Sequence, residues 1–167
     1  RNISINYLIY INFYNKIITG DFMADVYKFI NNLKINNKYV VVASSGGPDS
    51  MCLLDILLSL RDKLNIEIVV AHVHHNLRKE SDEEAISLEK FCKKNNLIFE
   101  FYKIEKYPND KFSEETARKI RYEFFDTVVK KYGADVLFTA HHGDDQIETI
   151  LMRLTRGSSL KGYAGIE

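Results

Sequence analysis

The sequence predicts an α/β fold built on a parallel, twisted sheet with helices on both faces. Strand-like apolar runs alternate four times with segments of helical periodicity, and after the N-terminal stretch no repeat or low-complexity linker interrupts them. The run at 66–73 is apolar on both faces, as in a strand covered on both sides. Polar clusters follow three of the four strands, where such sheets bind ligands. The predicted architecture is therefore Rossmann-like.

The first half of the chain contains two predicted helices and two predicted strands. Apolar residues at helical spacing, from Val26 to Leu33, indicate a helix that packs on the sheet. The second helix is apolar on nearly every side, so we expect it to be buried. The expected elements are a helix over 25–33, a strand over 39–43, a helix from about 50 to 60 and a strand over 66–73.

The second half continues the alternation, with recognisable helix ends. Ser81 to Glu84 form a capping box that opens a helix to Lys94. Ser113 is a candidate N-cap for the next helix, and Gly133 closes it. The remaining expected elements are strands over 97–102 and 135–140 and a last helix from 141–144 to about 156–157.

Length and composition indicate one globular domain. The 167 residues are 46% hydrophobic and 28% charged, and 23 Lys and Arg balance 23 Asp and Glu. The zero net charge gives no argument for nucleic-acid binding by the chain as a whole. Cys52 and Cys92 lie far apart in apolar surroundings, which predicts reduced core thiols in a cytoplasmic protein and no cysteine-based metal site.

The N-terminal stretch differs in composition from the rest. Residues 1–22 are rich in Ile, Asn and Tyr, and polar residues interrupt them, so they predict neither a membrane span nor a cleaved leader. We expect an atypical extension over 1–22, with Met23 as a candidate natural start. The functional domain is expected over 23–167, truncated at its C-terminus.

The segment between the first strand and the second helix carries the strongest chemical signal, Ser45-Gly46-Gly47-Pro48-Asp49-Ser50. Gly46 and Gly47 let the backbone take a positive φ and let an anion approach the N–H groups. The hydroxyls and the helix N-terminus favour a phosphate at the same point. Asp49 would repel that phosphate unless a divalent cation lies between them. A nucleotide carried with Mg²⁺ fits best, and no lysine follows Gly47 as a Walker loop requires.

Two further clusters lie downstream. Arg118 and Arg121 share a helical face, and beside the glycine loop they are better explained as a triphosphate clamp than as a surface ion pair. Residues 139–149 place three carboxylates after two histidines, more than helix-dipole compensation requires. Asp144 or Asp145 could bind Mg²⁺, and His142 could position or deprotonate a nucleophile.

The remaining histidines allow weaker hypotheses. Residues 72–78 could contact a base, a ribose or an RNA, and a hydrogen-bonded turn is an equally good explanation. A zinc site could be drawn from the five histidines, but their spacing matches no standard zinc site.

The loop at 45–50 resembles the Ser-Gly-Gly-x-Asp-Ser loop of the PP-loop ATP pyrophosphatases, which cleave ATP between its α and β phosphates and have an adenine nucleotide alpha hydrolase-like fold. Several segments together resemble one branch of these enzymes, the tRNA(Ile)-lysidine synthases. They are residues 45–50, 72–77, 117–122, 139–149 and 153–157. The resemblance implies ATP-dependent joining of lysine to the wobble cytidine of an isoleucine tRNA with a CAU anticodon, with release of pyrophosphate and AMP.

By position, the resemblance implies a role for each matching residue. The 45–50 loop, Pro48 included, would hold the phosphates, with Asp49 and Asp145 on Mg²⁺. Arg118 and Arg121 would stabilise the phosphoryl transition state. The activated base and the incoming lysine would be served by His142, Asp144 and Asp145.

Three alternatives remain open at this point. A sibling thiolating enzyme would use the same loop but rely on paired cysteines. An amidotransferase-linked synthetase would lack the 139–149 pattern, and a non-catalytic nucleotide-binding module would not require Asp49, Arg118 and Asp145. Family members continue well past residue 166, so we expect this chain by itself to bind ATP weakly and modify tRNA poorly. A homodimer is left open, and no membrane partner is expected.

Overall fold

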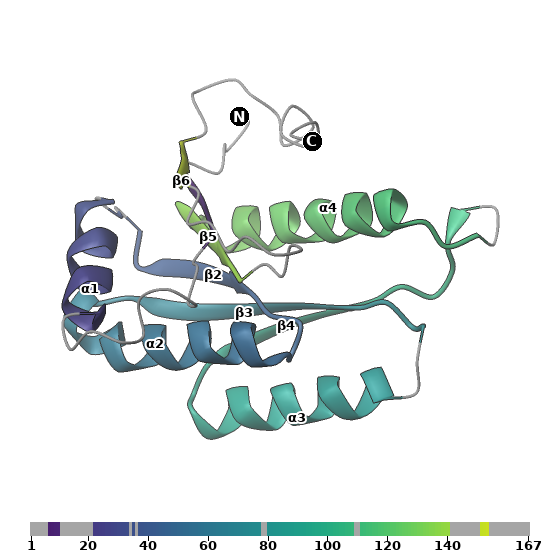
Figure 1. The fold of residues 1–167 in the computed structure, drawn as a ribbon, viewed down its shortest axis with the longest axis horizontal. Coiled ribbons are helices and arrows are strands. Elements are labelled where there is room, and N and C mark those ends of the chain that lie inside the picture. The colour runs from purple at the N-terminus through teal and green to yellow at the C-terminus, as the bar shows by residue number, and fades with distance from the viewer. Residues whose placement is uncertain are drawn as a thin grey trace.

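The computed structural model describes residues 7–10, 22–33, 35, 37–77, 80–108, 111–140 and 151–153. Its ten elements are β1 (Tyr7–Tyr10), α1 (Phe22–Asn32), β2 (Tyr39–Ala43), α2 (Pro48–Leu64), β3 (Glu67–His74), α3 (Glu80–Lys94), β4 (Ile98–Lys103), α4 (Glu114–Tyr132), β5 (Val136–Thr139) and β6 (Leu151–Arg153). They form one six-stranded sheet in the order β4-β3-β2-β5-β1-β6. Helices cover both faces of the sheet, with α4 on one side and α2 and α3 on the other (Figure 1).

The five strands from β4 to β1 run parallel, and β6 pairs antiparallel with β1. The predicted fold class is confirmed. The chain passes from β2 outward through β3 to β4 and then returns to the other side of β2 as β5. This reversal creates a switch point at the carboxyl ends of β2 and β5, where sheets of this class bind their ligands.

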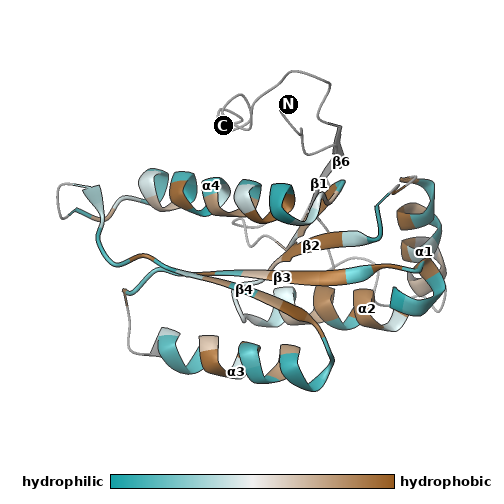
Figure 2. Ribbon diagram, turned by 180° about the vertical axis from the view of Figure 1, so that it is seen from behind, coloured by the Kyte–Doolittle hydropathy of each residue, from teal (hydrophilic) through white to brown (hydrophobic). Residues whose placement is uncertain are grey.

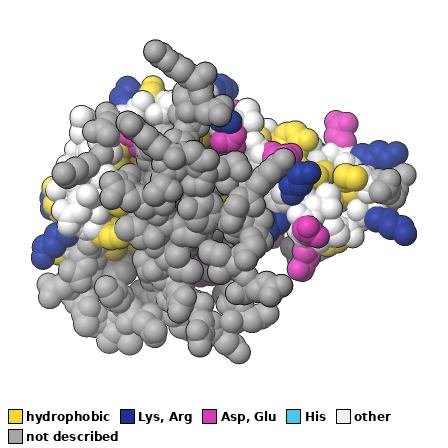
Figure 3. All heavy atoms as spheres, turned by 90° about the horizontal axis from the view of Figure 1, so that it is seen from above, with side chains coloured by type: hydrophobic (Ala, Val, Ile, Leu, Met, Phe, Trp, Pro, Cys, Tyr) yellow, Lys and Arg dark blue, Asp and Glu magenta, His cyan; other side chains and the backbone are white. Residues whose placement is uncertain are grey.

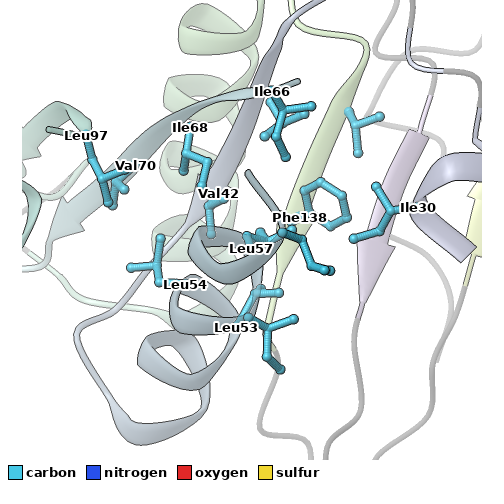
Figure 4. Packing of buried hydrophobic residues seen from close by; sticks show 14 of the residues in the cluster. Ile30, Val42, Leu53, Leu54, Leu57, Ile66, Ile68, Val70, Leu97 and Phe138 are labelled. Atoms are coloured by element: carbon cyan, nitrogen blue, oxygen red, sulfur yellow. The ribbon is translucent and has the colours of Figure 1, made fainter. Parts of the chain in front are cut away.

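The core has two layers because the central strands bury both faces. On one face, Val40 and Val42 pack with helices α1, α2 and α3, while on the other Val41 packs with α4. Figure 4 shows Leu53, Leu54 and Leu57 of α2 gathered against the strands. The hydropathy view shows the same pattern, with apolar central strands between helices that carry polar residues on part of their surface (Figure 2).

Helix ends follow the residue types present. Ser113 caps α4, as predicted: its Oγ accepts the Thr116 N–H at 3.1 Å and donates to Thr116 Oγ1 at 2.7 Å. Gly133 ends α4 at a φ of 61°, and Asn65 ends α2 at a φ of 52°. These left-handed residues let the chain leave each helix and enter the next strand.

Two expectations differ from the structure, and one further strand lies in the N-terminal stretch. Helix α3 begins at Glu80, so Ser81 lies inside its first turn and is not the N-cap of a capping box. Residues 151–153, expected in a helix, form β6, because pairing with β1 satisfies their backbone groups across the sheet. β1 itself lies in the stretch read as an atypical extension, and it joins the sheet beside β5.

Other details concern lengths and surfaces. Helix α2 starts at Pro48 and continues to Leu64, beyond its expected end, because Asn65 supplies the stop.

Cys52 and Cys92 are free thiols, as predicted, and burial raises the pKa of each, that of Cys92 to about 11. Among the described helices, none is long and apolar enough to cross a membrane. Lys, Arg, Asp and Glu side chains are interspersed over the visible described surface on the α4 side (Figure 3).

We predict that Ser113→Ala lowers the free energy of unfolding by about 1 kcal/mol, because the Thr116 N–H loses its acceptor. Urea denaturation measures this change. Ser87→Ala is the matched control, since Ser87 is an exposed residue inside α3 and alanine has the higher helix propensity. Equal losses for the two variants would contradict the capping role of Ser113.

Candidate nucleotide-binding site

The glycine loop connects β2 to α2 at the switch point of the sheet. Gly46 has a φ of +83°, which a residue with a β-carbon rarely adopts. Gly47 is the N-cap of α2 in an extended conformation with no side-chain cap, and Pro48 occupies the first turn. The first turn of α2 therefore faces the carboxyl edge of the sheet without a capping side chain, an arrangement that favours an anion.

Serine hydroxyls hold the loop in shape. Ser50 Oγ donates to the Gly47 carbonyl at 2.9 Å, and Ser44 Oγ donates to Ser50 Oγ at 3.1 Å. The N–H groups of Gly46 and Gly47 donate to Ser44 Oγ and Ser45 Oγ, both at 3.3 Å. These last two bonds are long for an amide donor, so both N–H groups can transfer to a better acceptor such as a phosphate oxygen.

Neighbouring elements support the loop from two sides. His72, at the carboxyl end of β3, is buried and donates from Nδ1 to the Ser44 carbonyl at 2.7 Å. Burial lowers the pKa of His72, against the opposing effect of this hydrogen bond. A β-carbon added to Gly46 would lie 3.7 Å from Glu84 of α3, so that helix closes the other side. The loop is thus held by a hydrogen bond from β3, and α3 lies close to it on the other side.

Thr139 adds an unsatisfied polar atom at the same place. It is the last residue of β5 and lies opposite Ala43, the last residue of β2. Its Oγ1 is buried, and among the described residues it has no hydrogen-bond partner. A buried hydroxyl without a partner at the switch point fits a polar ligand bound there.

The two predicted arginines lie on α4, on the opposite face of the sheet from α2. Burial lowers the pKa of His75, and the nearby Arg121 lowers it further; burial raises the pKa of Tyr107, and Arg121 opposes that rise. The Arg118 guanidinium lies 5.5 Å from the centre of the Tyr122 ring, a cation–π contact. Both side chains are half-buried and sit in the first half of α4.

His142, Asp144 and Asp145 lie outside the described residues, as do His141 and Arg78. The structure therefore describes the loop and the arginines but leaves the third cluster a prediction. Within the described residues, no three His, Cys, Asp or Glu side chains form a group that could hold a metal ion.

Sequence reasoning missed two residues that the fold brings to this edge. The sequence indicates Glu84 only as part of a capping motif, and no local motif singles out Tyr107. Tyr107 OH lies 3.1 Å from His75 Nδ1 and donates to the His75 carbonyl at 3.2 Å. Tyr107 follows β4 at its carboxyl end, and the rule that such positions line the site could have found it.

The fold and the loop define an α/β nucleotide-binding domain. Residues 19–167 match the family described as PP-loop domain, and the chain belongs to that family. Its relatives include the tRNA(Ile)-lysidine synthases of Geobacillus kaustophilus, 45% identical over 132 residues, and Clostridium tetani, 45% identical over 134 residues. These matches cover 76% and 77% of this chain but only 28% of each relative, so the chain spans less than a third of their length.

A solved structure supports the fold. The U34-tRNA thiolase NcsA from Methanococcus maripaludis, with its 4Fe-4S cluster, superposes with a TM-score of 0.56 at 17% identity. The match covers 78% of this chain and 50% of that one. At this level of identity the likeness concerns the fold alone.

We predict that Gly46→Ala lowers the free energy of unfolding by about 1–2 kcal/mol, because its φ of +83° strains any residue with a β-carbon. The 3.7 Å distance to Glu84 leaves room, so the cost is conformational and not steric.

Gly47→Ala is the matched control for this measurement. Its backbone is extended, and the new methyl group would meet only the flexible Ser45 hydroxyl, at 3.3 Å. The lower entropy of the unfolded chain, about 0.4–1 kcal/mol, offsets that contact. If Gly47→Ala lowered the free energy of unfolding more than Gly46→Ala, the requirement for a positive φ at Gly46 would be contradicted.

A second prediction concerns pH. His72 and His75 have lowered pKa values in the folded chain, mainly through burial, relative to 6.5. As the pH falls below 6.5, the unfolded chain binds protons that these folded imidazoles do not, so the free energy of unfolding should decrease. Above 6.5 this contribution is constant.

Urea denaturation at about pH 7.5 and about pH 5.5 measures the effect. His72→Asn removes one titrating group while an amide N–H can still reach the Ser44 carbonyl, so the decrease between the two pH values should become smaller. An unchanged decrease would show that His72 is not kept neutral by the fold.

Proposed function

We propose that this chain is the ATP-activating part of a tRNA(Ile)-lysidine synthase. The observation that carries the proposal is the Ser45–Ser50 loop at the switch point, in a chain about 45% identical to curated synthases over three quarters of its length. In the proposed reaction the wobble cytidine O2 attacks the α-phosphate of ATP, and pyrophosphate leaves. The amino group of lysine then attacks carbon 2, and AMP leaves with its oxygen.

The loop geometry supports phosphate binding by this chain. Gly46 and Gly47 present N–H groups, and Ser45 and Ser50 present hydroxyls, at the N-terminus of α2. Thr139 Oγ1 offers an unsatisfied hydroxyl next to them. The residues therefore fit a triphosphate, and its negative charge is favoured by the helix dipole.

Mg²⁺ fits the carboxylate chemistry of the site. Asp49, in the first turn of α2, and Asp145 are the proposed ligands. The ion would neutralise the negative charge of the triphosphate and the charge that develops on the leaving pyrophosphate. Without the ion, Asp49 would repel a phosphate beside it. A divalent cation between the two would explain why an anion-binding loop contains a carboxylate.

The remaining roles are assigned as follows. Arg118 and Arg121 stabilise charge that develops on the α-phosphate. His142, Asp144 and Asp145 serve the activated base and the incoming lysine. The proposed partners are an isoleucine tRNA with a CAU anticodon and free lysine, and the proposed location is the cytoplasm.

The thiolating alternative has less support. Cys52 lies on α2 and Cys92 on α3, both are free, and burial raises both pKa values. Cys92 is buried and Cys52 half-buried, and a protonated thiol with a raised pKa is a poor nucleophile and a poor metal ligand. The likeness to the solved thiolase extends to the fold alone, so it does not favour thiolation.

The test measures pyrophosphate release from ATP and Mg²⁺ by the natural polypeptide that contains this sequence, with an isoleucine tRNA carrying a CAU anticodon. We expect release that requires the tRNA, followed by AMP release when lysine is added. Release that is indifferent to lysine would contradict the lysidine reaction.

We predict that Asp49→Asn lowers the rate of pyrophosphate release about 100-fold or more, because the amide lacks the negative charge of the proposed Mg²⁺ ligand. The amide keeps the size and shape of the half-buried side chain, so much of the fold should stay intact. Asp55→Asn is the matched control, an exposed aspartate on the same helix. Equal activities for the two variants would remove Asp49 from the mechanism.

A further inference from the structure

Tyr107 connects two segments at the carboxyl edge of the sheet that are far apart in sequence. It lies between β4 and α4. Its hydroxyl forms hydrogen bonds with two atoms of His75, 32 residues earlier in the chain. The distances are 3.1 Å to Nδ1 and 3.2 Å to the carbonyl oxygen. The Tyr107 ring meets Phe112 edge-on at 5.3 Å and packs against the core on the α4 side. Tyr107 is therefore fixed independently of His75.

These two contacts determine which nitrogen of His75 carries the proton. A phenol has one hydrogen, and the His75 carbonyl can only accept, so the Tyr107 hydrogen is used there. The second contact then requires Nδ1–H to donate to the phenol oxygen. A neutral imidazole protonated on Nδ1 has a lone pair on Nε2.

We infer that Tyr107 is a positioning residue: it holds His75 in the Nδ1–H tautomer, so that His75 Nε2 accepts a hydrogen bond from an N–H or O–H group of the bound substrate. The inference rests on the proposed function for the identity of that substrate. The donor belongs to the nucleotide, the tRNA or the lysine amine, and the three share this hydrogen-bonding chemistry.

The surroundings keep His75 able to accept. Burial lowers its pKa most, the positive charge of Arg121 lowers it further, and protonation of His72 or His74 would act in the same direction. At neutral pH the ring is therefore uncharged, and Nε2 keeps its lone pair. Arg121 lies close by and adds N–H donors, so acceptor and donor groups lie near each other at the carboxyl edge of the sheet.

The neighbouring His74 shows the opposite arrangement. Its Nδ1 accepts the Asn76 N–H at 3.0 Å, which places the proton on Nε2, 3.1 Å from Asp82 Oδ1. Asn76 adopts a φ of 55° to make this turn. Two adjacent histidines are thus held in opposite tautomers by different partners, which gives the test an internal reference.

The tautomers can be measured directly by ¹H–¹⁵N NMR of the chain with ¹⁵N-labelled histidine. We expect a pyridine-type Nε2 for His75 and a pyridine-type Nδ1 for His74. Tyr107→Phe should move His75 toward the Nε2–H form and leave His74 unchanged. Tyr102→Phe is the control, because Tyr102 is an exposed tyrosine stacked on Phe124. A protonated Nε2 in wild-type His75, or no response to Tyr107→Phe, would overturn the inference.

Ligand additions identify the donor. Mg²⁺-ATP, the tRNA and lysine are added in turn, and the addition at which the His75 Nε2 resonance moves identifies its partner. No movement at any step, in protein that releases pyrophosphate, would overturn the acceptor role. Failure of the proposed function is distinguishable, because wild-type protein would then release no pyrophosphate while the tautomer spectra remain valid.

Kinetics provide a second readout. His75→Asn keeps an amide near the Nδ1 position for Tyr107 but has no acceptor in place of Nε2, so kcat/KM should fall about tenfold, the effect of one hydrogen bond. For Tyr107→Phe, kcat/KM should fall by a smaller factor, since part of the His75 population retains the lone pair on Nε2. Tyr102→Phe should match wild type. A His75→Asn enzyme with unchanged kcat/KM would overturn the role of Nε2.

Discussion

The site depends on one buried hydrogen bond, from His72 Nδ1 to the carbonyl oxygen of Ser44 at 2.7 Å. It joins the carboxyl end of β3 to the first residue after β2, and so fixes where the glycine loop leaves the sheet. The Ser44 N–H bonds in turn to the Ala71 carbonyl at 3.0 Å, which extends the strand pairing by one residue. The loop can therefore take an unusual shape without a flexible connection, because its entrance is held by the rigid centre of the sheet.

The loop combines an unusual backbone conformation with support from serine hydroxyls. Gly46 adopts a positive φ, which glycine takes at little cost, and the N-terminus of α2 has no side-chain cap for its N–H groups. Serine hydroxyls satisfy part of the backbone, with bonds to the Gly46 and Gly47 N–H groups that are long. A turn with weakly satisfied donors that point to the carboxyl edge gives up some stability so that the same donors can bind an anion.

The differences from expectation arise where pairing partners lie far away in the chain. β6 was expected to be helical from its local pattern, but Leu151–Arg153 pair with β1, more than 140 residues earlier. Local periodicity cannot reveal such a pairing, since the register depends on strands already present. The start of α3 at Glu80 shows a smaller difference: the helix begins one residue before Ser81, so the local capping motif does not set its first residue.

The sequence by itself determined the α/β order, the buried strands β2 and β3, the N-cap at Ser113 and the glycine loop between β2 and α2, because each depends on neighbours within a few residues. It also indicated Arg118 and Arg121 as candidates. Only the tertiary structure decided that His72 supports the loop, that Glu84 closes its side, and that Tyr107 fixes His75. These contacts join residues separated by about 30 positions or more, and the parallel crossovers bring them to one edge of the sheet.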